Sequence, residues 1–164
     1  ENSLKKTKFL SNCAGPPLRA AREVAKPTVL VSDSPEEASK VIGASKAEAA
    51  TILRGEQDVF FAACRDFYNR PGGEQNVPCE KPWECLTCQN AIVTRHLLPR
   101  VLAFRDFMAE QRKELQPDDW SLKFSKAWQV LHAEILPKFS AETIEEAERY
   151  AALERLYIPL SIKQ

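Results

Sequence analysis

Four cysteines in the middle of this 164-residue chain have side chains and a spacing that suit metal binding. Cys64, Cys79, Cys85 and Cys88 follow the pattern C-x14-C-x5-C-x2-C. A C-x2-C pair with two further thiols nearby is typical of a tetrahedral thiolate site for Zn²⁺. The residues between Cys64 and Cys79 include two glycines, two prolines and two asparagines, with neither helical nor strand periodicity. We therefore expect these four cysteines to be structural zinc ligands that hold a loop-rich stretch.

Other interpretations of the cysteines stay open. Four thiolates also suit an iron–sulfur cluster, and free cysteines often pack as small apolar residues or act in redox chemistry. His96 lies eight residues after Cys88 and could replace one thiol as a ligand. Cys13 would remain as a free thiol. A site closed by four thiolates has no open coordination position, so we expect a structural centre and not a catalytic one.

Nothing else in the sequence forms a catalytic constellation. Neither His96 nor His132 belongs to an H-E-x-x-H motif, and His132-Ala133-Glu134, which has the H-x-E spacing, lies far along the chain from the cysteines. Gly72 and Gly73 follow no predicted strand and precede no lysine of the kind found in phosphate-binding loops. We expect no enzymatic activity and no small-molecule substrate.

Charge and hydropathy narrow the class of protein. Lysine plus arginine and aspartate plus glutamate number 23 each, which disfavours strong non-specific binding to nucleic acid. Residues 1–30 are locally basic, with six basic and two acidic side chains, so we interpret 1–33 as a leader or linker that could also contact phosphate. There is no long apolar segment and no signal peptide, so we expect a cytoplasmic protein without a membrane. Because the chain begins with Glu1, we expect a fragment or a processed product.

Two short helices with clear start signals are expected over residues 34–55. Ser34 and Ser45 each begin a capping box, and Gly43 and Gly55 supply the left-handed exits. The outline is that of a helix-turn-helix. Exposed side chains on it could face a DNA groove, although plain packing of a helical hairpin explains the same pattern. The candidate DNA-binding residues are Lys46, Thr51 and Arg54.

The remaining elements are mostly helical by periodicity. Residues 28–31 could form a strand or an extended linker, and 58–67 is predicted to be a helix that leads into Cys64. Helices are expected over about 95–115, 117–136 and 140–156, packed as a three-helix bundle. The predicted fold is mainly α. One domain (34–164) would contain the hairpin (34–55), a metal loop (64–88) stapled by zinc on four cysteines, and the bundle (95–158).

The block around the cysteines contains Cys64-x-Asp66-Phe67, Pro78-Cys79, Trp83-x-Cys85-Leu86-x-Cys88 and Asn90-Ala91-x-Val93-Thr94-x-x-Leu97-x-Pro99. It resembles a region downstream of the catalytic domain in large bacterial tyrosine-type site-specific recombinases, the integrases. The resemblance covers about residues 40–140. It implies a C-terminal accessory region that helps bind DNA or assemble the recombination complex with other protomers. The family's catalytic residues have no counterpart, since His96 and Arg100 are wrongly spaced for H-x-x-R. The alternative is a zinc-stapled protein interaction module without a DNA role.

Overall fold

The structure is a computed structural model that describes residues 24–153, and Cys13 and most of the predicted leader lie outside this range. The described chain is mainly helical, as predicted, with a small three-stranded sheet. No helix in it is long and apolar enough to cross a membrane. The elements are β1 (Thr28–Leu30), α1 (Pro35–Ile42), α2 (Lys46–Leu53), β2 (Ala63–Cys64), the 3-10 helix η1 (Pro82–Thr87), β3 (Ala91–Thr94), the 3-10 helix η2 (Arg95–Leu97), α3 (Leu98–Glu114), α4 (Pro117–Val130), the π-helical turn η3 (Leu131–Ile135), the 3-10 helix η4 (Leu136–Lys138) and α5 (Ala141–Ala151).

The sheet joins three segments that are far apart in the sequence. β3 is the central strand, parallel to β1 on one side and antiparallel to β2 on the other. Val29 pairs with Val93, and Cys64 pairs with Ala91. The β-prone run at 28–31 therefore is a strand, and these residues, which we had placed in the leader 1–33, belong to the sheet. β3 itself was not predicted.

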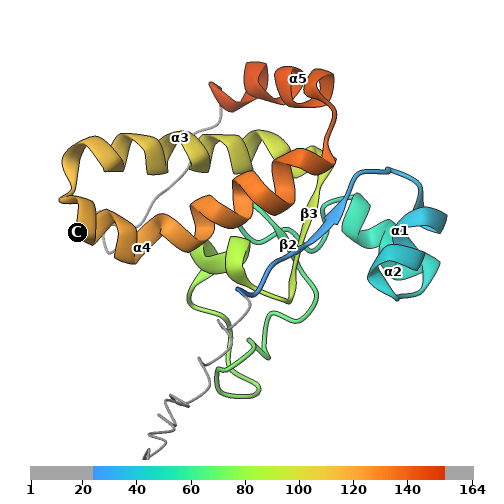
Figure 1. Ribbon diagram of the computed structural model, residues 1–164. Coiled ribbons are helices and arrows are strands. Elements are labelled where there is room, and N and C mark those ends of the chain that lie inside the picture. The colour runs from blue at the N-terminus through green and yellow to red at the C-terminus, as the bar shows by residue number, and fades with distance from the viewer. Residues whose placement is uncertain (1–23, 154–164) are drawn as a thin grey trace, which may run out of the picture.

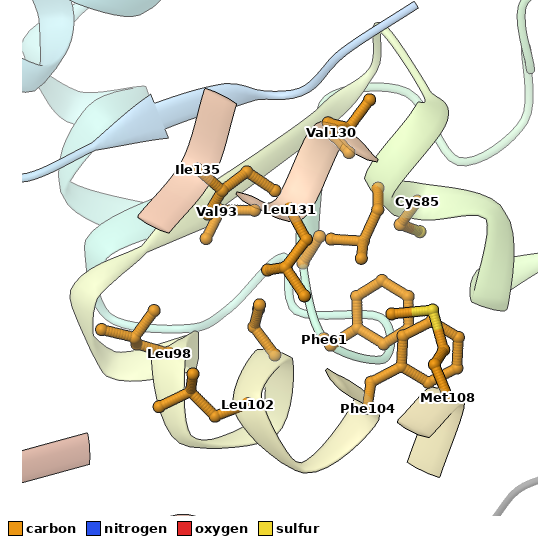
Figure 2. Close-up of a cluster of buried hydrophobic side chains, with 14 of the residues drawn as sticks. Phe61, Cys85, Val93, Leu98, Leu102, Phe104, Met108, Val130, Leu131 and Ile135 are labelled. Atoms are coloured by element: carbon orange, nitrogen blue, oxygen red, sulfur yellow. The ribbon is translucent and has the colours of Figure 1, made fainter. Parts of the chain in front are cut away.

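The central strand divides the core into two clusters. Ile92 packs with the α1–α2 hairpin, whereas Ala91 and Val93 face the larger cluster beneath α3 and α4. This alternation follows from the two-residue period of a strand, and it makes β3 buried on both faces. Figure 1 shows the hairpin on one side of the sheet and the long helices on the other. Figure 2 shows Val93 with Leu98, Leu131 and their neighbours in the larger cluster.

The helical hairpin has the predicted bounds. α1 ends at Ile42, and Gly43 follows in the left-handed conformation with φ 65°. At α2 the Ser45 hydroxyl accepts a hydrogen bond from the Glu48 amide at 3.1 Å, as in a capping box. The Ser34 hydroxyl instead donates to the Glu36 carboxylate, so it caps no backbone amide of α1.

The predicted helix over 58–67 is wrong. Residues 58–62 form a tight turn in which the Val59 amide donates to the Ala62 carbonyl, and Ala63–Cys64 then pairs with β3. The cause is tertiary: a chain segment placed beside the unpaired edge of β3 satisfies its backbone groups in the sheet. Phe61 is fully buried at this corner and stacks on Phe104 of α3.

The C-terminal half contains the three expected long helices. α3 packs against both α4 and α5, and Figure 1 shows it between them. Trp120, Phe124 and Val130 of α4 are buried, and the Trp120 indole donates to the Met108 carbonyl at 2.7 Å. Ser140 caps α5 by accepting from the Thr143 amide. Thr94 precedes the 3-10 helix η2, but its hydroxyl contacts the His96 ring and caps no backbone amide.

Candidate metal centre

All four predicted cysteines line one small cavity, which is the central observation at this site. Cys64 is the last residue of β2, and Cys79 follows the long loop that leaves it. Cys85 lies within η1, and Cys88 follows directly after this 3-10 helix. The sheet and η1 therefore bring thiols from both ends of the 64–88 segment to the same place.

The cavity that the cysteines line is small. Its volume is about 20 Å³, close to the minimum that holds one water molecule. Four thiolates are the donor set of structural zinc sites and also of iron–sulfur clusters, so the residue types are compatible with either group.

Burial disfavours the ionised thiolate form of Cys85. Burial, the largest cause, acts together with the neighbouring thiols of Cys88, Cys64 and Cys79 to raise the pKa of its thiol to about 12. Arg70 acts in the opposite direction. A thiol in such a place remains protonated unless a cation compensates the sulfur charge, and a bound metal ion does this directly.

Burial also disfavours the thiolate of Cys64, but a backbone amide donates a hydrogen bond that favours it. Burial raises the pKa of its thiol, and the Asp66 amide partly opposes this by donating a hydrogen bond to the sulfur. Arg70 and Lys81 also line the cavity. Zn²⁺ with four thiolates carries a net charge of −2, so two nearby cations favour that species.

The thiols nevertheless do not stand at coordination geometry. Among residues 24–153, no three histidine, cysteine, aspartate or glutamate side chains form a ready-made metal site. The four sulfurs therefore share a cavity without surrounding its centre as metal ligands do. Neutral thiols pack as small apolar groups, and gripping an ion would require them to turn toward it.

Asp and Asn side chains hold the loop between Cys64 and Cys79 by hydrogen bonds, and we did not predict these contacts. The Asp66 carboxylate accepts from the Tyr68 and Asn69 amides at 3.2 and 3.1 Å. The Asn90 side chain donates to the carbonyls of Asp66 and Asn69, and Asn69 accepts from the Asn76 amide. Asp and Asn followed by turn residues are the signal that could have revealed this. These hydrogen bonds brace the loop from within and connect it to Asn90, directly before β3.

His96 lies elsewhere and has other partners. Its ring contacts the Thr94 hydroxyl through Nδ1 at 2.8 Å and the Asp58 carboxylate through Nε2 at 2.9 Å. It does not line the cysteine cavity. The chain Thr94–His96–Asp58 instead ties the end of β3 to the turn after α2, and its hydroxyl end is fully buried. The four cysteines are therefore the better ligand set.

The candidate DNA-binding residues lie on α2 and directly after it, and all three have protein partners. Lys46 forms an ion pair with Glu36, and Arg54 pairs with Glu56 at 2.6 Å. The Thr51 hydroxyl donates to the Glu48 carbonyl and contacts the Gln57 amide. Residues 34–57 carry four acidic and three basic side chains, so the hairpin does not present the basic surface expected of a DNA-binding helix.

Comparison of the chain with protein-family models, with curated proteins and with solved structures finds no match. The fold and the cysteine cavity are therefore interpreted from their own chemistry.

Proposed function

We propose that this chain is a non-catalytic module stapled by a four-cysteine zinc centre, and that it works by binding other proteins. The observation that carries the proposal is the meeting of Cys64, Cys79, Cys85 and Cys88 at one small cavity. A closed thiolate centre stabilises a fold and leaves no position for a reacting water molecule. Zinc bound there would connect β2, the long loop and η1 into one unit.

The biological setting that we propose comes from the resemblance to integrases. In that setting the module is an accessory domain that helps assemble the recombination complex. The finer arrangement of helical hairpin, zinc staple and three-helix bundle belongs to this proposal. Protein contacts are favoured over DNA contacts because Lys46 and Arg54 already pair with acidic neighbours. Partners would then be recombinase protomers or associated proteins.

Metal analysis of the purified full chain tests the centre. We expect about one zinc ion per chain, no iron and no colour, and loss of zinc in Cys85→Ala and Cys79→Ala. Cys13→Ala is the matched control, since it removes a thiol outside the described residues. Wild-type protein that contains no zinc after purification with added zinc, or a Cys85→Ala variant with unchanged metal content and melting temperature, contradicts the proposal.

A second measurement separates protein binding from DNA binding. Fluorescence anisotropy with a labelled mixed-sequence duplex at low salt reports electrostatic contact with phosphate. We expect weak binding that is the same for the wild type and for Lys46→Ala with Arg54→Ala. Tight, steeply salt-dependent binding that this double variant abolishes would instead support the helix-turn-helix interpretation.

A further inference from the structure

A second, larger cavity lies next to the cysteine loop, between η1 and α4. It has a volume of about 400 Å³, which is in the range of ligand-binding clefts. η1 contributes Trp83, Glu84 and Thr87, and these residues flank Cys85 within the C-E-K-P-W-E-C-L-T-C segment. In Figure 1 this yellow-green 3-10 helix lies beside α4. One wall of the cavity is therefore built on the same short helix as a candidate zinc ligand.

The interior of this groove is aromatic and apolar. Phe104 and Phe124 form its floor, and both are almost fully buried. The half-buried indole of Trp83 lies on the opposite wall. Leu122 extends the apolar surface to the outside, where 87% of it is exposed. An exposed leucine beside an aromatic cleft is typical of a surface that another molecule covers.

The rim of the groove is positively charged. Lys123 and Lys126 line it from α4 and, within residues 24–153, neither forms an ion pair. Glu84, the acidic residue in the lining, already pairs with Arg70 and Lys81. The net field at the rim therefore favours carboxylates on a partner.

We infer that this groove, defined by Trp83, Phe104, Leu122, Lys123, Phe124 and Lys126, binds a short segment of a partner protein. The segment has one large apolar side chain for the aromatic floor and acidic residues next to it for the two lysines. An anchored apolar side chain with flanking charges is a common form of peptide recognition. The inference deepens the proposed function, on which it rests, by placing the interaction surface and giving the chemistry of the partner.

Zinc binding at the cysteines would also affect the groove, because both share the 3-10 helix η1. Trp83 and Glu84 directly precede Cys85, so an ion that fixes Cys85 and Cys88 also fixes the wall of the groove. Rigid placement of an aromatic wall lowers the ordering cost of binding. We therefore expect tighter peptide binding by zinc-loaded protein than by the chelated protein.

Selection from a phage-displayed library of random peptides, each about 12 residues long, on the zinc-loaded full chain tests the inference. We expect enriched peptides to share a large apolar residue with aspartate or glutamate within a few positions. Synthetic fluorescein-labelled versions should bind at least tenfold more weakly to Lys123→Glu with Lys126→Glu, and also more weakly to Leu122→Ser. The matched control is Lys40→Glu with Lys138→Glu, which changes the net charge equally away from the groove and should alter the affinity less than twofold.

The outcomes separate this inference from the zinc proposal. Failure to enrich any peptide, enrichment of basic peptides, or equal affinity in the groove and control variants would overturn the docking surface, even with one zinc per chain. Acidic peptides that depend on Lys123 and Lys126 would support it, even in a protein that binds no metal, and in that case the zinc centre alone is wrong. Melting temperatures of all variants within a few degrees of the wild type show that the changes act at the surface.

Discussion

Phe61→Ala is the substitution that most directly tests how the cysteine region is joined to the helices. Phe61 is fully buried, and its ring stacks on Phe104 of α3 with centroids 4.6 Å apart and 26° between planes. It also contacts the ring of Phe60 at 4.8 Å. It precedes β2, so it anchors the strand that delivers Cys64 (Figure 2).

The magnitude follows from the burial. Truncation of a buried phenylalanine to alanine costs about 3–5 kcal/mol, because apolar surface is lost and a cavity remains. A domain of this kind has a free energy of unfolding of about 5–15 kcal/mol, so the loss is a large fraction of the total. The melting temperature should fall by roughly 10 °C. A double-mutant cycle of Phe61→Ala with Phe104→Ala should show a coupling of about 0.5–1.5 kcal/mol from the stacked rings.

Urea unfolding of the zinc-loaded full chain, followed by far-UV circular dichroism, measures these differences. Tyr68→Ala is the matched control, because it truncates an aromatic side chain of the same region that is 56% exposed. We expect the control to cost about 1 kcal/mol or less. Equal losses in Phe61→Ala and Tyr68→Ala would refute the burial of Phe61 in this segment.

Three further predictions follow from individual contacts. Ser45→Ala should lower the free energy of unfolding by about 1 kcal/mol through loss of a helix cap, whereas Ser34→Ala should cost less, since Ser34 caps no amide; chemical denaturation compares the two. Burial and the nearby Arg105 lower the pKa of His132 in the folded protein, so the unfolded chain binds a proton at this imidazole more tightly than the folded chain does. The free energy of unfolding should therefore fall as the pH drops from about 7 to about 5. His132→Gln should make the melting temperature depend less on pH over this range. In chelated protein, Cys85 should react with iodoacetamide at about pH 8 more slowly than Cys79, because burial raises the pKa of Cys85 to about 12 and the thiolate is the reactive form; mass spectrometry of peptides measures both rates, and equal rates would contradict this order.

The ends of a helix could be predicted from the sequence where capping residues lie next to it in the chain. Ser45 and Ser140 cap α2 and α5 through their own hydroxyl groups, and Gly43 ends α1 with a positive φ. These contacts span only a few residues, so the sequence states them directly. The gathering of the four cysteines was likewise predictable, because C-x2-C spacing and a loop between thiols limit where they can lie.

The sheet was decided by contacts that no local pattern contains. Thr28 pairs with Ile92, and Ala63 pairs with the same residue from the other side. Short strands of two to four residues have little intrinsic preference, and the hydrogen bonds of their neighbours determine whether they form. The segment before Cys64 looked helical because Phe60 and Phe61 are apolar. In the structure residues 58–62 form a turn, and only Ala63–Cys64 pairs with the edge of β3.

The starts and ends of the helices and the choice of four candidate thiols can thus be predicted from the amino-acid order. The burial of β3 on both faces, the bracing of the loop by Asn90 and Asp66, and the aromatic groove between η1 and α4 appear only in the folded chain. The difference lies in how far apart along the chain the interacting residues are. Caps and turns depend on neighbours along the chain, whereas strand pairing, loop bracing and clefts depend on segments that meet after the chain has folded.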